Sequence, residues 1–244
     1  MRSFFCRCRV FGASLLLSCY ATAAENAADQ ARKDARKYTD SGDYAKALER
    51  HQWYHQNALA IDLAQKGVRL SFALGDCLKL AEKYPPALEA LKRTRDDGTK
   101  DLEAGTAPAE LFNDVLAINI ELRDSVATIV LFKFLDASHP ELARACFRFA
   151  DTALVEAREI DLFLRYAGDL RVYLRDKVQS HNELMSDLKY CRNIPAAAIE
   201  QFDQRLFVLT DFLAGLAIDQ GNSGLAAELA SFTSTAVAER RFAK

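Results

Sequence analysis

Two histidines in an aromatic stretch are the residues best suited to chemistry. His51 and His55 stand four positions apart, so on a helix both side chains would face the same side. Two imidazoles in this arrangement could hold a transition-metal ion. No glutamate follows His51, so the metalloprotease pattern HExxH is absent, and a third ligand would have to come from elsewhere. We favour two histidines on a partly exposed aromatic face and keep a metal-binding or enzymatic protein as an alternative.

No other group of residues forms a catalytic pattern. The sequence has no GxSxG, no P-loop and no glycine-rich dinucleotide fingerprint. Carboxylates such as Asp96 and Asp97 are ordinarily solvated charge on helical surfaces. His139 and His181 stand alone, and His139 is expected to start a helix just before Pro140. We therefore expect no enzyme and no cofactor.

The cysteines fall into two groups. Three lie close to the N-terminus, and the others are far apart, at Cys77, Cys146 and Cys191. This spacing contains no CxxC pair and no zinc-finger pattern. In an oxidising compartment any two of the three could form one disulfide. The simpler interpretation is that all three are small buried apolar residues.

The N-terminus has the pattern of a bacterial export signal. Arg2, Arg7 and Arg9 are followed by an apolar stretch from Val10 to Tyr20 and by small residues at 21–24. A basic segment, a short apolar segment and small residues predict a signal peptide over residues 1–24. The apolar stretch is too short to span a bilayer. We expect a periplasmic protein.

A lipid anchor is the alternative to free release. The stretch Leu16-Leu17-Ser18-Cys19 resembles a bacterial lipobox, in which the cysteine is acylated and becomes the mature N-terminus. Cys19 would then tether the protein to a membrane surface. No other contact with a membrane is expected.

Composition predicts an all-α fold. The chain of 244 residues is 50% hydrophobic and 27% charged, with only 10 glycines and 5 prolines. Few helix breakers favour helices, whereas a sandwich or barrel would need many more turn residues. The formal net charge of −2 is too balanced for electrostatic binding of nucleic acid. We therefore expect no nucleic-acid partner.

Turn signals divide the chain into helical segments. The predicted breaks are at 41–43, 83–86, 96–108, 138–140, 193–195 and 220–224. Each proline at these breaks can occupy the first turn of the next helix. Helices joined by short turns should pack as antiparallel hairpins.

Small and large residues recur along these hairpins. Ala31, Ala35, Tyr38, Gly42, Tyr44 and Ala47 follow at intervals of 4, 3, 4, 2 and 3. This spacing resembles the tetratricopeptide repeat. A second copy can be laid over 74–91, a weaker third over 115–131 and a fourth of little specificity over 147–160. A better copy lies over 213–226. Small residues at a helix crossing let the two backbones approach closely, and large residues fill the adjoining gaps.

The resemblance implies one helical-repeat domain over residues 25–244. A single hairpin cannot bury its apolar face alone, so successive hairpins would stack into a right-handed α-solenoid. An irregular helical bundle is the alternative.

The resemblance also implies a function, the binding of a peptide or helix on the concave face. The first helix of each repeat builds this face in the family, which places on it Arg32, Arg36, Arg69, Phe72, Asp76, Lys79, Phe112 and Asn119. Such a basic, partly apolar strip suits a protein segment with carboxylates and an apolar anchor. We predict an exported scaffold for protein–protein interaction in the cell envelope. A structural component of an envelope assembly without a peptide groove is the alternative.

Overall fold

The computed structural model describes residues 27–188 and 196–242. These residues are helical throughout, joined by turns, and contain no strand, as the low glycine and proline content predicts. The predicted signal peptide, Cys19, Cys191 and the predicted break at 193–195 lie outside the described residues.

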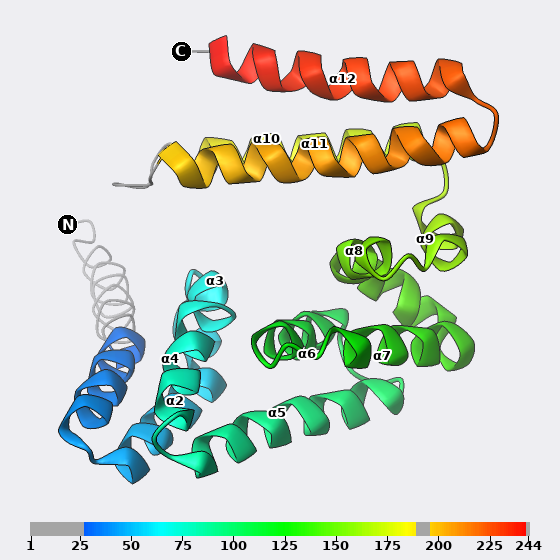
Figure 1. Cartoon of the computed structure of the whole chain (residues 1–244). Coiled ribbons are helices and arrows are strands. Elements are labelled where there is room, and N and C mark those ends of the chain that lie inside the picture. The colour runs from blue at the N-terminus through cyan, green and yellow to red at the C-terminus, as the bar shows by residue number, and fades with distance from the viewer. Residues whose placement is uncertain (1–26, 189–195, 243–244) are drawn as a thin grey trace, which may run out of the picture. The chain divides into compact units, whose positions relative to one another are not determined.

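The helices follow one another through short turns (Figure 1). Residues 27–41 form the first described helix. The helices of the next part are α2 (Tyr44–Ile61), α3 (Gln65–Arg69), α4 (Phe72–Ala81), α5 (Pro85–Glu103), α6 (Ala109–Glu121), α7 (Ser125–Ser138) and α8 (Pro140–Glu156). The remaining helices are α9 (Ile160–Ala167), α10 (Leu170–Leu188), α11 (Ala196–Asp219) and α12 (Ser223–Phe242).

The chain divides into two compact units, with the boundary after Glu159. In the first unit, the most extensive contacts are between helices one or two positions apart in the chain, as between α5 and both α6 and α7. In the second unit, α10, α11 and α12 pack against one another. The predicted repeats over 31–47, 74–91, 115–131 and 213–226 each coincide with a helix–turn–helix pair. The repeat predicted over 147–160 crosses the unit boundary.

One turn geometry recurs at the ends of several helices. The amide of Asp43 donates to the carbonyl of Tyr38 at 2.9 Å, and that of Asn222 donates to the carbonyl of Ala217 at 2.8 Å. The same six-residue closure ends α6 and α8. The residue before the donor has a positive φ at Gly42 (83°), Arg123 (58°), Arg158 (57°) and Gly221 (76°). Each is the left-handed residue that commonly ends a helix, and at two positions it is an arginine.

Small residues lie where the first two hairpins meet. Ala47 and Ala87 are fully buried and share one core cluster with Cys77 and Leu80. Their size lets α2, α4 and α5 approach closely. These are the crossing positions that the repeat pattern predicts.

The predicted break at residues 96–108 is wrong over its first half. Helix α5 continues through Asp96, Asp97 and Gly98 to Glu103. Gly98 is buried, and a Cβ atom added there would lie 2.9 Å from Cγ2 of Val115 on α6. The glycine therefore marks a close approach of two helices rather than a turn.

The two described cysteines, Cys77 and Cys146, are buried and free. Burial raises the pKa of the Cys77 thiol to about 11 and that of Cys146 to about 12. Both thiols therefore stay protonated at neutral pH and are poor nucleophiles.

The second unit holds a buried polar pair. His181 on α10 lies 2.9 Å, from Nε2 to Oδ1, from Asp203 on α11, and both side chains are almost fully buried. The isolation of His181 expected from the sequence is thus wrong, because tertiary packing brings in a carboxylate 22 residues away.

No helix in the described ranges 27–188 and 196–242 is both long enough and apolar enough to cross a membrane.

Candidate functional site

Three of the predicted groove residues meet between the first helix and α4. Nε of Arg36 donates to Oδ2 of Asp76 at 2.8 Å, and its Nη2 lies 2.7 Å from the same oxygen. Arg32 is 3.8 Å from this carboxylate and stands over the ring of Tyr54. These charges therefore pair with each other and hold the first helix against α4. Phe72 and Lys79 on α4 are exposed.

Arg69 links α3 to neighbouring helices and contributes little to the surface, since only 8% of the residue is exposed. Its Nη2 donates to Oδ2 of Asp114 on α6 at 2.7 Å. Its Nε donates to the backbone carbonyl of His55 on α2, also at 2.7 Å. The prediction that Arg69 lines a partner groove is wrong, because its guanidinium is already engaged by residues of α2 and α6.

Phe112 and Asn119 lie in the core. Each is only 1% exposed, and the Phe112 ring packs edge-on against Phe132 with centroids 6.0 Å apart. Neither side chain can line a groove in this structure. The assignment took the wrong face of α6, since this helix carries apolar residues on two faces.

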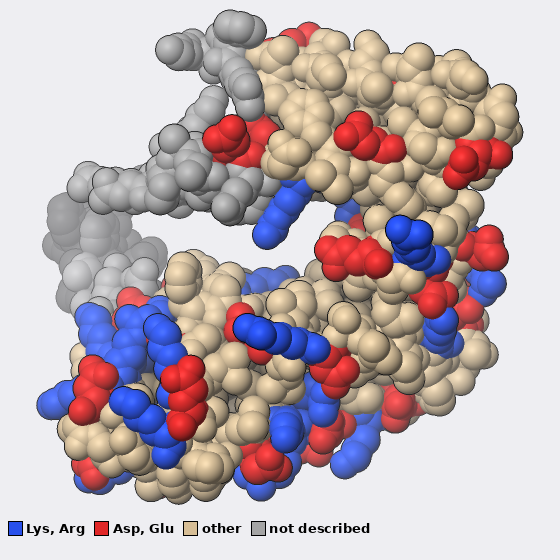
Figure 2. Space-filling model, in the orientation of Figure 1, with Lys and Arg blue, Asp and Glu red and all other residues tan. Residues whose placement is uncertain are grey.

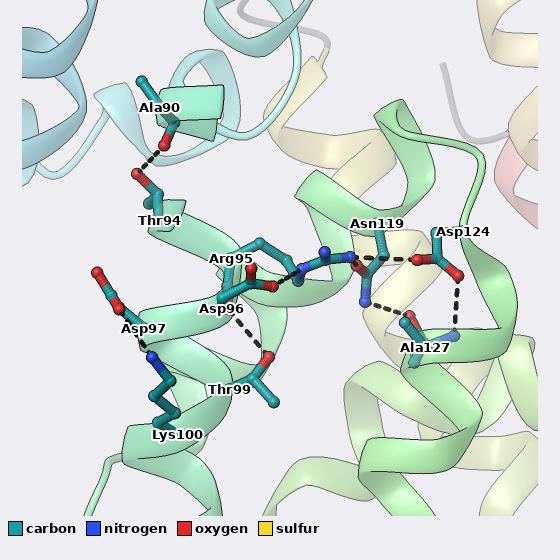
Figure 3. A network of polar contacts seen from close by, with 11 residues as sticks. Ala90, Thr94, Arg95, Asp96, Asp97, Thr99, Lys100, Asn119, Asp124 and Ala127 are labelled. Carbon is teal, nitrogen blue, oxygen red and sulfur yellow. Dashed lines mark hydrogen bonds and ion pairs between the residues drawn. The ribbon is translucent and has the colours of Figure 1, made fainter. Parts of the chain in front are cut away.

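Asn119 belongs to a polar network between α5, α6 and α7 (Figure 3). Nη1 of Arg95 donates to Oδ1 of Asn119 and to Oδ2 of Asp124, at 3.2 Å in each case. Nδ2 of Asn119 donates to Oγ1 of Thr128 at 3.1 Å. Asp124 also accepts from the amide of Ala127 and so caps α7. This network fixes the α6–α7 turn against α5.

Charges of both signs are interleaved on the face of the first unit drawn in Figure 2. Lysine and arginine side chains gather at its lower left with aspartate and glutamate beside them, and the two signs alternate elsewhere on it. The exposed ion pairs Lys46–Asp43 and Lys92–Glu89 also place opposite charges together.

His51 and His55 lie on the same face of α2, as their spacing predicts. Both line a small pocket of about 40 Å³ between α2, α4 and α5. Burial lowers the pKa of each imidazole to about 4. Both rings are therefore neutral at pH 7, and Nε2 of His51 has no hydrogen-bond partner among the described residues.

The surroundings of His55 disfavour a metal ion. Nη2 of Arg69 lies 3.2 Å from Nε2 of His55, and because arginine only donates, this nitrogen must accept. The guanidinium therefore occupies the ring nitrogen that would bind a metal. Within the described residues, no group of three or more His, Cys, Asp or Glu side chains could hold a metal ion.

An open groove of about 480 Å³ lies between α3 and α6. The α3 side is formed by Lys66, Gly67 and Leu70, and the α6 side by Asn113, Leu116, Ala117, Ile120 and Glu121. We call this set the α3–α6 groove. Its lining is mostly apolar, and Ile120 is 64% exposed. Such open apolar surface is typical of interaction sites.

The Arg69–Asp114 pair sets the spacing of this groove. Arg69 stands within the run of α3 residues that line it, and Asp114 stands beside Asn113 on α6. A buried ion pair between the two helices therefore fixes the distance between the walls. The groove was not predicted from the sequence, although the apolar residues Leu116, Ala117 and Ile120, which lie outside the core face of α6, were a signal for it.

The chain matches no family model, no curated protein and no solved structure. The resemblance to tetratricopeptide repeats thus stays a prediction, and function has to be argued from geometry.

Proposed function

We propose that this protein is an exported helical-repeat scaffold that holds a segment of another protein in the α3–α6 groove. Stacking of its hairpins into an α-solenoid of the tetratricopeptide type belongs to the same proposal. The N-terminal signal pattern supports export to the periplasm, or tethering through Cys19.

Two features support the stacked-hairpin arrangement. Helices of the first unit contact their close neighbours in the chain, which is the pattern of a repeat array. A residue with left-handed backbone ends the first helix of the pairs that meet at Gly42, Arg123 and Gly221. A shared turn geometry in these three pairs favours hairpins of similar shape.

The single observation that carries the binding function is the open apolar groove. Apolar side chains such as Leu116 and exposed Ile120 line a concave site on rigid helices. A partner side chain that enters this site would remove apolar surface from water on both sides, and this is the main favourable contribution to protein association. The helices already stand in place, so little ordering would oppose binding.

A photo-crosslinking amino acid placed at position 116 in living cells tests this proposal. We expect it to capture a defined partner, whereas the same amino acid at exposed Ala145 on α8 should not. Capture at position 116 should be lost when Ile120→Glu places a charge in the groove. The matched control is Val208→Glu on α11, which changes a residue of similar exposure (58% against 64%). Equal capture by the two variants would contradict the groove.

The predicted basic face is tested separately by Arg36→Glu combined with Lys79→Glu. Arg69 stays unchanged in this variant because it is a buried tie. If the variant loses partner capture but keeps the melting temperature of the wild type, the basic face belongs to the binding site. If capture is unchanged, the binding site consists of the α3–α6 groove alone.

A specific observation also favours the assembly component. Val126, Val130 and Phe134 are exposed at successive four-residue steps along α7, so they form an apolar stripe on one helix face. This stripe could pack against another envelope protein. Val130→Glu should then reduce recovery of the assembly and leave the crosslink at position 116 intact.

A further inference from the structure

We infer that the α3–α6 groove selects a protein segment of fixed charge order, with an acidic residue beside Lys66, apolar residues in the middle and a basic residue beside Glu121. This inference rests on the proposed function, because it describes the partner of the same groove.

Lys66 and Glu121 mark opposite ends of the groove. Lys66 stands three residues before Arg69, whose guanidinium pairs with Asp114 in the first half of α6. The lowered pKa of Glu110 agrees with this place, since it follows first from a backbone hydrogen bond and further from Arg148 and Lys66. Glu121 is the last residue of α6. On α6 the groove lining runs from Asn113 to Glu121, and these eight steps, at a rise of about 1.5 Å each, span about 12 Å. The groove therefore has a positive end and a negative end.

Both end charges are available to a partner. Neither Lys66 nor Glu121 has an ion-pair partner among the residues that the structure describes. Neighbouring charges are already engaged, since Glu110 pairs with Arg148 and Asp114 pairs with Arg69. A segment with opposite charges at these ends would gain two ion pairs without breaking any that exist.

The middle of the groove is apolar. Leu70 contributes from the α3 side, and Leu116 and Ile120 from the α6 side, while Gly67 and Ala117 leave room between them. Apolar contacts supply affinity but accept many sequences in either direction. Charges at the rim decide the orientation, because a reversed segment would place like charges together.

These dimensions define the partner's sequence. A span of about 12 Å corresponds to about four residues of extended chain or about eight residues of helix. We therefore expect an acidic and a basic residue at one of these separations, with at least two apolar residues between them.

Selection of peptides on the full chain tests this inference. A phage library of random 16-residue peptides would be selected on the wild-type protein, and the affinity of the peptides measured by fluorescence anisotropy. We expect the acidic–apolar–basic order, and at least tenfold weaker binding to the Lys66→Glu, Glu121→Lys variant. A peptide with its two charges exchanged should bind this variant better than it binds the wild type.

The matched control exchanges another pair, Glu89→Lys with Lys92→Glu on α5. These residues form an exposed ion pair away from the groove lining, and the exchange also leaves the net charge unchanged. Binding should stay at the wild-type level.

Two failures are distinguishable. If selected peptides are lost with Ile120→Glu but bind the Lys66→Glu, Glu121→Lys variant as they bind the wild type, the charge order is overturned while the groove stands. If no peptide is selected, or if Ile120→Glu leaves binding unchanged, both the charge order and the proposed function are overturned.

Discussion

At the scale of single residues, burial determines the charge state of the two histidines of α2. His51 and His55 are held neutral because water is excluded from both rings. Asp76, Arg36 and Arg32 surround His51, and Arg69 and Asp114 surround His55. Burial outweighs the two carboxylates, which would favour the protonated rings. Their spacing, which suggested a metal site, follows from a helix face that packs against α4 and α5.

This burial makes stability depend on pH. Each histidine has a folded-state pKa of about 4, below the ordinary value of about 6.5 in the unfolded chain. The unfolded state therefore binds more protons as the pH falls through 6.5, and folding becomes weaker. Between pH 7.5 and 5 we expect a loss of about 2 kcal/mol for each histidine. Urea denaturation at several pH values measures this loss.

Replacing one histidine supplies the control. His51→Phe should remove about half of the pH dependence in this window, since only one titrating ring remains. An identical pH slope in the variant and the wild type would show that His51 titrates normally. The window stops at pH 5 because most carboxylates remain ionised above it.

The buried tie at Arg69 gives a second prediction. Arg69→Met leaves Asp114 without its cation in a partly buried site, so we expect a loss of about 2 kcal/mol or more in the free energy of unfolding. Arg148→Met breaks an exposed pair with Glu110 and should change stability by less than about 1 kcal/mol. Denaturant titration compares the two. Equal small effects would mean that Arg69 is not the tie between α3 and α6.

At the scale of elements, the turns explain which helix boundaries were visible in the sequence. The breaks at Gly42, Pro85 and Pro140 were predicted correctly from glycine or proline, but the break at Gly168, between α9 and α10, was missed. The turns at Arg123 and Arg158 were missed because arginine carries no turn signal. The opposite error occurred at Gly98, where glycine serves helix packing. Residue type alone does not tell these uses of glycine apart.

The two arginine turns predict a stabilising substitution. A left-handed conformation is unfavourable by about 1 kcal/mol for residues with a Cβ atom, and glycine adopts it freely. Arg123→Gly and Arg158→Gly should therefore each raise the free energy of unfolding by up to about 1 kcal/mol. Arg93→Gly inside α5 should lower it by about the same amount. The melting temperatures of the three variants measure these effects. A lower melting temperature in all three would contradict the left-handed turn geometry at Arg123 and Arg158.

At the scale of the whole molecule, the chain forms two compact units, in each of which helices pack against their neighbours in the chain. The groove lies within the first unit, between helices far apart in the sequence but joined by one ion pair. In the second unit, the pairs His181–Asp203 and Thr210–Thr233 hold the long helices together. In both units, polar side-chain pairs connect residues on different helices.

Export is a property of the whole chain and is predicted from its N-terminus. The mature protein should begin at Ala24 or Glu25, or at an acylated Cys19. Mass spectrometry of the N-terminal peptide from fractionated cells checks this. Detection of residues 1–18 on protein from the cytosol, with none in the periplasm or the membrane, would contradict it.

The sequence by itself determined the helical class, about half of the turns between the described helices and the small residues at the hairpin crossings, because these depend on local propensity and spacing. It also located Arg32, Arg36 and Asp76 near one another, through the repeat register. Only the tertiary structure decided which apolar face of α6 becomes core. Phe112 and Asn119 turned inward, while Leu116 and Ile120 remained at the surface. Periodicity cannot choose between two apolar faces, because the choice depends on which neighbouring helices pack there.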